Sequence, residues 1–414
     1  MIFTVGNVQA GFYGHIDTRV QADNRYTGST GFVEEYADIH FVDPKQGIES
    51  GLSLAVRQVT ELDESEATLY QLYFAKKLEG LVSSYRLGRL ERSDSLGFYT
   101  LDGAVLKSAH NDRLFTLYAG KPSRIDDYDS VNGDALYGFD LYFSEIQLPQ
   151  LSPSIVFDNA FVRCGWQRLE DDESGNAGHE TRLNWGLSTG GEINSSAIHG
   201  FGLDFNGSYL ASENNTEQLQ FSAYGDLGKK NRVQFDYETF SLNEPYLSFR
   251  EQFYSLYVRG RQTSFAASFF YSPNGHTQWI SKGRSVLREY GENGYGLTLG
   301  MQRREYSGTE YVAQLDYLNL EKDTMASLYL ETDYSFSAFI KSRLSAVIQN
   351  QNKWLSGNNQ ALGFEADLQQ MLRSGLYFTL SLTRVWNSHL DDEYQFGLKL
   401  SYRFDDRKKW WSDD

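Results

Sequence analysis

Charged side chains recur at alternate positions in several segments of the 414-residue sequence. Lys341 and Arg343 are two residues apart, and so are Glu365 and Asp367. Residues two apart in an extended strand point to the same face of a sheet. A row of such charges can steer ions and polar solutes, which is electrostatic chemistry without covalent bond formation. The residues predicted to line one polar interior are Asp17, Arg19, Arg57, Arg86, Asp204, Asp236, Glu238, Asp316, Glu331, Asp333, Lys341, Arg343, Glu365, Asp367, Lys399 and Arg403.

Acidic residues outnumber basic ones in this set and in the whole chain, which has 55 Asp and Glu, 38 Lys and Arg and a formal charge of −17. The excess favours cations, or a basic or polar partner, beside the polar face. The alternative is that these charges only solvate the face and form cross-strand pairs. The same negative charge disfavours binding of nucleic acid, because it repels phosphate.

Histidines that could act as general bases are scattered along the chain. None belongs to an H-E-x-x-H motif, and the sequence contains no G-x-S-x-G or P-loop motif. We therefore expect no enzyme activity and predict no catalytic residue; a hydrolase embedded in a membrane barrel is the alternative. The seven histidines are His15, His40, His110, His179, His199, His276 and His389.

The acidic stretch "LEDDESGNAG" at 169–178 carries the residues best suited to a metal ion. Glu170, Asp171, Asp172 and Glu173 could supply the oxygen ligands that calcium prefers. Their spacing does not match an EF-hand loop and is more typical of a solvated acidic loop, so we predict no metal site. Cys164 is the only cysteine, which excludes an internal disulfide and covalent haem attachment through C-x-x-C-H. We expect no cofactor in this chain and a buried or lipid-facing place for Cys164.

Apolar residues alternate with polar ones along most of the sequence, as in "EYQFGLKLSYRF" at 393–404. Such segments are about 10 to 15 residues long and number about 22, within a range of about 18 to 26. No apolar run approaches the roughly 18 residues that a membrane helix needs. The 37 Gly, 28 Tyr and 27 Phe favour strands and turns. We predict an all-β, closed antiparallel transmembrane β-barrel, because lipid leaves the backbone groups of an open sheet edge unsatisfied.

A soluble multi-sheet protein would show the same alternation. Its strands are usually only about five or six residues long, and a chain of this length would contain linkers between domains. No Pro-rich, Ser-rich or charged linker divides this sequence. We therefore predict a single barrel over 1–404 and a charged, aromatic tail over 405–414.

The connections predict one rim of short periplasmic turns and one rim of longer extracellular loops. Strands predicted at 248–260 and 262–273 precede the longest loop, 274–290, which could fold inward as a partial constriction. The first strand is expected near Val8, which leaves no N-terminal plug. The predicted short turns include 110–112, 228–230, 306–308 and 373–374, and the predicted long loops include 23–32, 122–134, 169–177, 274–290 and 351–359.

Two segments resemble Gram-negative outer-membrane porins and related barrel channels: "YRLGRLERSD" at Tyr85 to Asp94, and the last alternating strand. The last strand looks like a C-terminal insertion signal, although "DDRKKWWSDD" follows the aromatic residue that would usually end the chain. The resemblance implies a bacterial outer-membrane protein that contacts lipid and lipopolysaccharide and is inserted by the barrel assembly machinery. The apolar residues of this signal are Tyr394, Phe396, Leu398, Leu400, Tyr402 and Phe404.

Residues 1–7, "MIFTVGN", lack the basic start and the small-residue cleavage site of a signal peptide. We therefore expect that a signal peptide is absent from this numbering. Two transport roles follow from a wide, unplugged barrel. The leading one, by resemblance to porin–cytochrome electron conduits, is a sheath around a partner such as a multihaem cytochrome, which would carry the only haem. The other is a passive or selective diffusion or export porin.

Overall fold

The computed structural model describes residues 10–26, 28–59, 64–94, 97–123, 134–149, 152, 154–171, 178–193, 198–241, 259–321, 323–353, 357–388 and 392–408. These residues form one 23-stranded sheet and a three-residue 3-10 helix, η2 (Asp406–Lys408). No helix in the described ranges is long and apolar enough to cross a membrane.

The strands follow one another in chain order. They are β1 (Gly11–Tyr26), β2 (Gly28–Asp43), β3 (Ile48–Val59), β4 (Glu64–Lys77), β5 (Ser84–Asp94), β6 (Gly97–His110), β7 (Arg113–Ser123), β8 (Ala135–Ile146), β9 (Ile155–Phe157), β10 (Ala160–Asp171), β11 (Gly178–Ile193) and β12 (Gly200–Leu210). The second half comprises β13 (Asn215–Leu227), β14 (Asn231–Ser241), β15 (Arg259–Asn274), β16 (Thr277–Tyr290), β17 (Gly294–Arg304), β18 (Glu310–Leu320), β19 (Asp323–Ser335), β20 (Ile340–Lys353), β21 (Gly357–Arg373), β22 (Leu376–Asn387) and β23 (Glu393–Asp405).

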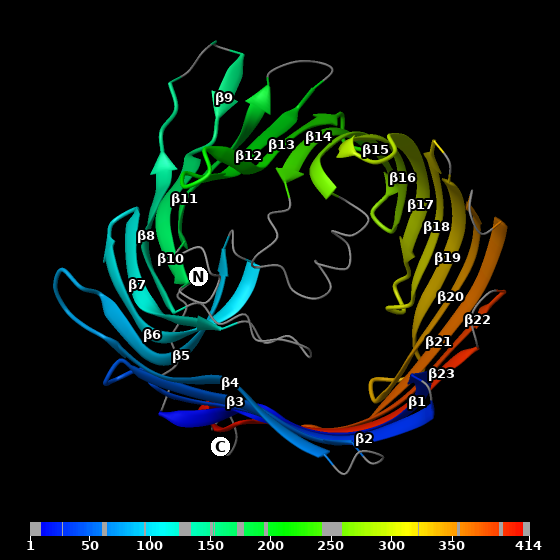
Figure 1. Cartoon of the computed structure of the whole chain (residues 1–414), viewed down its shortest axis with the longest axis horizontal. Helices are drawn as coiled ribbons and strands as arrows, with labels where there is room; N and C mark the ends of the chain where they lie inside the picture. Colours follow the sequence, from blue (N-terminus) through cyan, green and yellow to red (C-terminus); the bar gives the residue numbers. More distant parts are fainter. Residues whose placement is uncertain are drawn as a thin grey trace.

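The sheet closes on itself, because the first strand pairs with the last. β1 and β23 are antiparallel, with Asp17 opposite Ser401 and Arg19 opposite Lys399. Of the 23 strands all but β9 form this wall, so the barrel has 22 strands. The short strand β9 pairs only with the end of β11 and lies outside the ring (Figure 1). The predicted closed antiparallel barrel is confirmed, and the soluble multi-sheet alternative is wrong.

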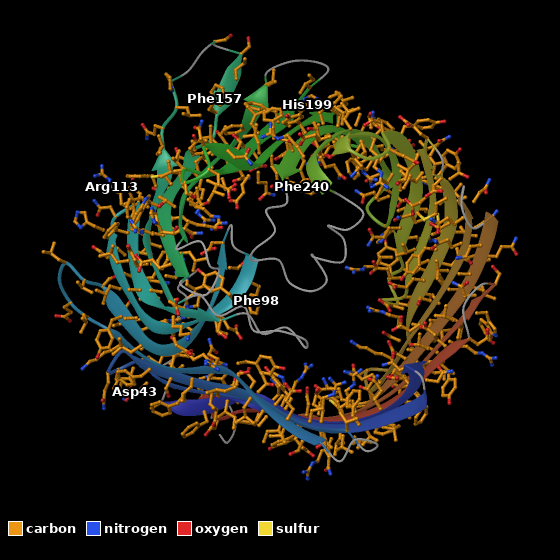
Figure 2. The ribbon with its side chains drawn as sticks, in the orientation of Figure 1. Asp43, Phe98, Arg113, Phe157, His199 and Phe240 are labelled. Atoms are coloured by element: carbon orange, nitrogen blue, oxygen red, sulfur yellow. The ribbon has the colours of Figure 1, made fainter. Side chains whose placement is uncertain are left out.

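The outer face of the wall is apolar, as the alternation predicts. On β1, Phe12 is 50% exposed and Ile16 is 41% exposed, although both are large apolar residues. Val20, further along the same face, is also exposed. Side chains project from the ribbon both into the ring and away from it (Figure 2). A wall of this kind is stable when hydrocarbon covers its outside, since lipid then removes the apolar side chains from water.

One predicted loop is a strand. The segment 274–290 contains the whole of β16, which pairs with β15 over most of its length and with β17 from Thr277 to Val286. Its outer face carries Ser281, Gly283 and Ser285, opposite Phe269, Ala267 and Phe265 of β15. Trp279 and Leu287 lie on the same face on either side of these three residues, but the small residues between them interrupt the apolar alternation in the sequence. The segment is therefore part of the barrel wall and does not constrict the lumen.

The predicted number of strands equals the number in the barrel partly because two errors in the prediction cancel. β16 is missing from the predicted set, whereas most of the strand predicted at 248–260 lies outside the described residues. The strand predicted at 262–273 belongs to β15, which already begins at Arg259.

Two further predicted loops are largely strand. β1 and β2 occupy 23–32 apart from residue 27, and β20 and β21 occupy 351–359 apart from residues 354–356. The centres of the predicted loops 122–134 and 169–177 lie outside the described residues. These loops were predicted to be too long because the strands continue past the segment in which apolar and polar residues alternate.

Three glycines lie side by side across β5, β6 and β7. Gly88 pairs with Gly103, and Gly103 pairs with Gly120. Gly88 has a φ of 121°, which side-chain-bearing residues rarely adopt, and a Cβ on Gly103 would collide with the carbonyl oxygen of Ala119. β4 pairs with β5 only as far as Arg89. Beyond this glycine line the ends of β5 and β6 leave the wall and project into the ring, where Figure 2 labels Phe98.

This inward hairpin (residues 89–94 and 97–102) packs against the inner face of the wall through apolar side chains. Leu90 and Leu101 are paired with each other and join a buried cluster with Leu136 of β8 and Leu169 of β10. Leu101 and Leu136 are both 0% exposed. Full burial of a leucine side chain contributes about 1.5–3 kcal/mol. The inward hairpin is therefore held by a small core of its own inside the barrel.

A buried ion-pair network fixes the tip of the inward hairpin. The guanidinium of Arg92 lies 3.2 Å from the carboxylate of Asp140 on β8 and 3.4 Å from that of Asp94. Its Cζ atom lies 3.6 Å from the ring centre of Tyr118 on β7. The hydroxyl of Tyr99 donates to Asp94 at 2.6 Å. Breaking a buried pair of this kind leaves an uncompensated charge, which costs about 3–5 kcal/mol.

Candidate functional site

The cross-strand register places the whole predicted set of charged residues on the inner face of the wall. Residues that are paired across neighbouring strands point to the same face, so the inner face can be traced from Asp17 and Arg19 on β1. The trace passes through Lys399 on β23 and Asp367 on β21 to Arg343 on β20. The remaining members are placed by the same rule, and they are Arg57, Arg86, Asp204, Asp236, Glu238, Asp316, Glu331, Asp333, Lys341, Glu365 and Arg403.

The apolar residues of the predicted insertion signal lie on the opposite, outer face of β23. Phe396, Leu400 and Tyr402 are exposed there, whereas Gly397 and Ser401, between them in sequence, are buried. β23 extends one residue past Phe404, and η2 follows it directly. Of the predicted tail, residues 409–414 lie outside the described residues.

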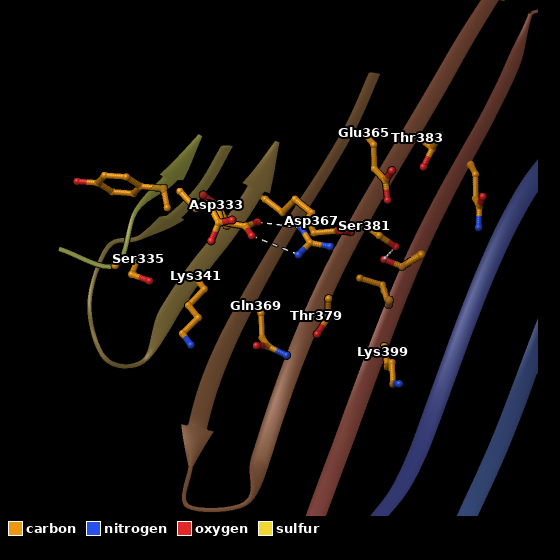
Figure 3. Close-up of a pocket in the computed structure, with 18 of the residues that line it drawn as sticks. Asp333, Ser335, Lys341, Glu365, Asp367, Gln369, Thr379, Ser381, Thr383 and Lys399 are labelled. Atoms are coloured by element: carbon orange, nitrogen blue, oxygen red, sulfur yellow. Dashed lines mark hydrogen bonds and ion pairs between the residues drawn. The ribbon is translucent and has the colours of Figure 1, made fainter. Parts of the chain in front are cut away.

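Part of the charged set converges on one hollow of about 820 Å³, on the inner face of β17–β23 and β1. Its basic lining residues are Arg19, Arg304, Lys341, Arg343 and Lys399, and its acidic ones are Glu310, Asp333, Glu365 and Asp367. Basic and acidic side chains are thus nearly balanced here, unlike in the chain as a whole. Figure 3 shows the side chains of Asp333, Lys341, Glu365, Asp367 and Lys399 projecting from neighbouring strands into the same space. We call this space the charged hollow.

Three parallel rows of side chains cross the strands of the charged hollow. The basic row is Lys341, Gln369, Thr379, Lys399 and Arg19, each directly opposite the next. The middle row is Asp333, Arg343, Asp367, Ser381, Gly397 and Gln21. The acidic row is Glu331, Ser345, Glu365, Thr383, Gln395 and Asp23.

Two side chains of the middle row form a bidentate ion pair. Arg343 donates from Nε to Asp333 at 2.8 Å and from Nη2 to the same carboxylate at 3.3 Å, as the dashed lines in Figure 3 show. Asp367 faces Arg343 from the next strand. Such fork geometry holds both side chains in place. The charge of Arg343 is therefore already paired with a carboxylate of the wall, and Arg343 is less available to a solute than Lys341.

Other predicted residues lie elsewhere on the inner face and are tied to their neighbours. Asp236 accepts from Ser222 at 2.8 Å, and Asp316 accepts from Thr298 at 2.6 Å. Arg86 lies 3.2 Å from Glu49. These contacts match the cross-strand pairing that the sequence left open as the alternative role of the inner charges.

Sequence reasoning missed inner-face bases on β16. Lys282 and Arg284 lie opposite Thr298 and Gly296, on the lumen side. They were assigned to a loop because small residues interrupt the apolar outer face of β16. The signal that could have found them is the spacing of Lys282, Arg284 and Arg288, each an even number of residues from the next.

Two histidines that look unrelated in the sequence meet on the inner face of β1 and β2. His40 Nε2 lies 3.1 Å from the Asp38 carboxylate, and His15 Nδ1 lies 3.8 Å from it. The hydroxyl of Ser53, which faces Asp38 from β3, bonds to Tyr36 at 2.8 Å and not to either imidazole. No nucleophile–base pair is therefore formed at this place.

The acidic stretch 169–178 begins within the last residues of β10, and only part of it lies in the described residues. Glu170 faces outward, accepts the Tyr137 hydroxyl at 3.0 Å and lies 3.4 Å from Arg168. Asp172 and Glu173 lie outside the described residues. The part of the chain that the structure describes contains no group of three or more His, Cys, Asp or Glu suited to a metal ion. Cys164 lies on the outer face, opposite Trp185 and Leu141.

No protein-family model matches the sequence. No curated protein matches it either. Among solved structures it is similar to the translocation pore of the P pilus usher PapC, with a TM-score of 0.45 and 8% identity over 95% of this chain and 100% of that chain. It is also similar to Acinetobacter baumannii OccAB4, with a TM-score of 0.43 and 10% identity over 96% of this chain and 98% of that chain. Pseudomonas aeruginosa OpdO gives a TM-score of 0.45 and 9% identity over 96% of this chain and 97% of that chain. Likeness at these values transfers no residue role, solute or partner to this chain.

Proposed function

We propose that this chain is an outer-membrane channel that conducts ions and small polar solutes through its lumen. The observation that carries the proposal is the charged hollow on the inside of a closed wall whose outside is apolar. An apolar outer band stabilises the wall in hydrocarbon, and charged inner side chains stabilise water and ions inside it. The proposal includes contact with lipid and lipopolysaccharide and insertion by the barrel assembly machinery.

The inward hairpin favours small solutes over large ones. It occupies lumen on the side of β7–β10 and is locked there by the buried cluster and the Arg92 network. The charged hollow lies on a different sector of the wall, from β17 through β23 to β1. A solute that moves along the charged hollow therefore passes a charged surface and does not need to displace the buried cluster of the inward hairpin.

A sheath around a multihaem cytochrome is the second candidate. The observation that favours it is the strand number, since barrels of 22 strands are wide enough to hold a folded plug. The haems and the electron transfer would belong to the partner. The inward hairpin takes up part of the space that such a partner needs, which ranks this role below the solute channel.

Reconstitution separates the two candidates. The chain is purified from outer membranes in mild detergent, the co-purifying proteins are stained for haem, and the barrel is added to planar bilayers in 1 M KCl. A solute channel gives steady single-channel steps from the isolated barrel, with no stained partner. A sheath gives a stained partner that stays bound in detergent, and conductance only after that partner is removed. Absence of steps from correctly folded barrel, with no partner present, contradicts both.

A further inference from the structure

The basic and acidic rows of the charged hollow lie at different heights on the same strands. On β20 Lys341 and Ser345 are four residues apart, as are Glu365 and Gln369 on β21. A strand advances about 3.3 Å per residue, so the two rows are about 13 Å apart along the strands. Lys341 lies near the beginning of β20, at the rim where β1 begins and β23 ends. The basic row is therefore the one closer to that rim.

Each row contains an exposed charge that the wall does not neutralise. Among the described residues, neither Lys341 nor Glu365 has an ion-pair partner within 4.0 Å, and both side chains are exposed in the hollow. Lys399, by contrast, is paired with Asp17 at 2.6 Å. Lys341 and Glu365 are thus free to bind a carboxylate and an ammonium group, respectively, that belong to a solute.

The surface between the two rows suits a peptide backbone. Ser381 of the middle row lies there, flanked by Gln369 and Thr379 of the basic row and by Thr383 of the acidic row, and these side chains offer both donors and acceptors. An extended peptide also advances about 3.3 Å per residue, so about four residues span the distance between the rows. The hollow of about 820 Å³ lies within the range of about 300–1,000 Å³ that is usual for ligand sites.

We propose that the charged hollow binds short zwitterionic peptides of about four residues in extended form, with the terminal ammonium at Glu365 and the terminal carboxylate at Lys341. This inference rests on the proposed channel function and names its solute class. The separated rows give the solute one orientation, because the reverse orientation would bring like charges together at both ends.

The experiment measures current block by tetra-alanine in single channels, with N-acetyl-tetra-alanine amide as the uncharged control. Tetra-alanine is expected to block at lower concentration than the capped peptide and than di-alanine or octa-alanine. Lys341→Gln and Glu365→Gln should each raise the half-blocking concentration of tetra-alanine about three- to fivefold, with little effect on the capped peptide. Lys282→Gln and Asp204→Asn are the matched controls on other inner strands, and they should leave the block unchanged.

The outcomes separate this inference from the channel itself. Normal single-channel steps with equal block by free and capped tetra-alanine, or with no preference for peptide length, overturn the peptide site and leave the channel intact. Absence of any steps contradicts the proposed function. The length and capping comparisons use the unmodified chain, so they decide the matter even where a substituted barrel does not assemble. Unit conductance in each variant reports whether its wall is formed.

Discussion

The carboxylate of Asp17 lies 2.6 Å from the ammonium group of Lys399, and this contact joins the first strand of the barrel to the last. The side chain of Asp17 is only 10% exposed, whereas that of Lys399 is 44% exposed. His15 Nε2 lies 3.8 Å from the same carboxylate. The seam of the barrel is therefore closed by backbone pairing of Tyr13–Asp23 with Gln395–Asp405 and by a short ion pair on its inner side.

Asp17→Asn should destabilise the barrel by about 1 kcal/mol, because it removes a short, half-buried ion pair and keeps the size of the side chain. The urea midpoint of unfolding in detergent, followed by gel mobility of unheated samples, measures the loss. The double variant with Lys399→Gln should lose less than the sum of the two single variants. Equal additive losses would show that the pair contributes nothing to closure.

Gly103→Ala should disturb the inward hairpin, because the new Cβ would collide with the carbonyl oxygen of Ala119. A forced clash of this kind costs about 1–3 kcal/mol. We expect a larger and noisier unit conductance in planar bilayers as the hairpin leaves the lumen. Gly300→Ala is the matched control, since its Cβ would have ordinary contacts with Ile280 and Ala313. A conductance for Gly103→Ala equal to that of Gly300→Ala would contradict the proposal that the inward hairpin narrows the lumen.

Leu101→Ala should weaken the core beneath the inward hairpin by about 2–5 kcal/mol, because Leu101 is fully buried. The expected readouts are a lower free energy of unfolding and faster cleavage of the hairpin by added protease. Leu362→Ala provides the comparison: Leu362 is 42% exposed on the outer face, where hydrocarbon or detergent can fill the space, so no cavity remains and its loss should cost less. If both variants unfold at the same denaturant concentration, the hairpin has no core of its own.

The sequence predicts the wall wherever its outer face is strongly apolar. β23 is the clearest case, since Phe396, Leu400 and Tyr402 alternate with polar residues in the sequence and point outward in the structure. β16 fails the same test because Ser281, Gly283 and Ser285 face outward in the middle of the strand. Period-two alternation reports the contrast between two faces, and it is lost where small or polar residues interrupt the apolar face.

The inward hairpin could not be predicted from local pattern. Leu90 looks like any apolar residue of an alternating strand, and its neighbour Arg92 looks like a solvated charge. Gly88, Gly103 and Gly120 are far apart in the chain, and only the register of β5, β6 and β7 brings them into one line. The charged hollow depends on register in the same way, because its rows combine residues from opposite ends of the sequence.

Charged thiol reagents test the central claim, a water-filled lumen inside a lipid-facing wall, most directly. In a Cys164→Ser background, single cysteines are placed by Thr379→Cys on the inner face of β22 and by Phe378→Cys on its outer face. A charged methanethiosulfonate is then added while single-channel current is recorded. The prediction is a stepwise, permanent change of current for the cysteine at 379 and no change for the one at 378. The same response at both positions, or a response only at 378, would contradict the lumen described here.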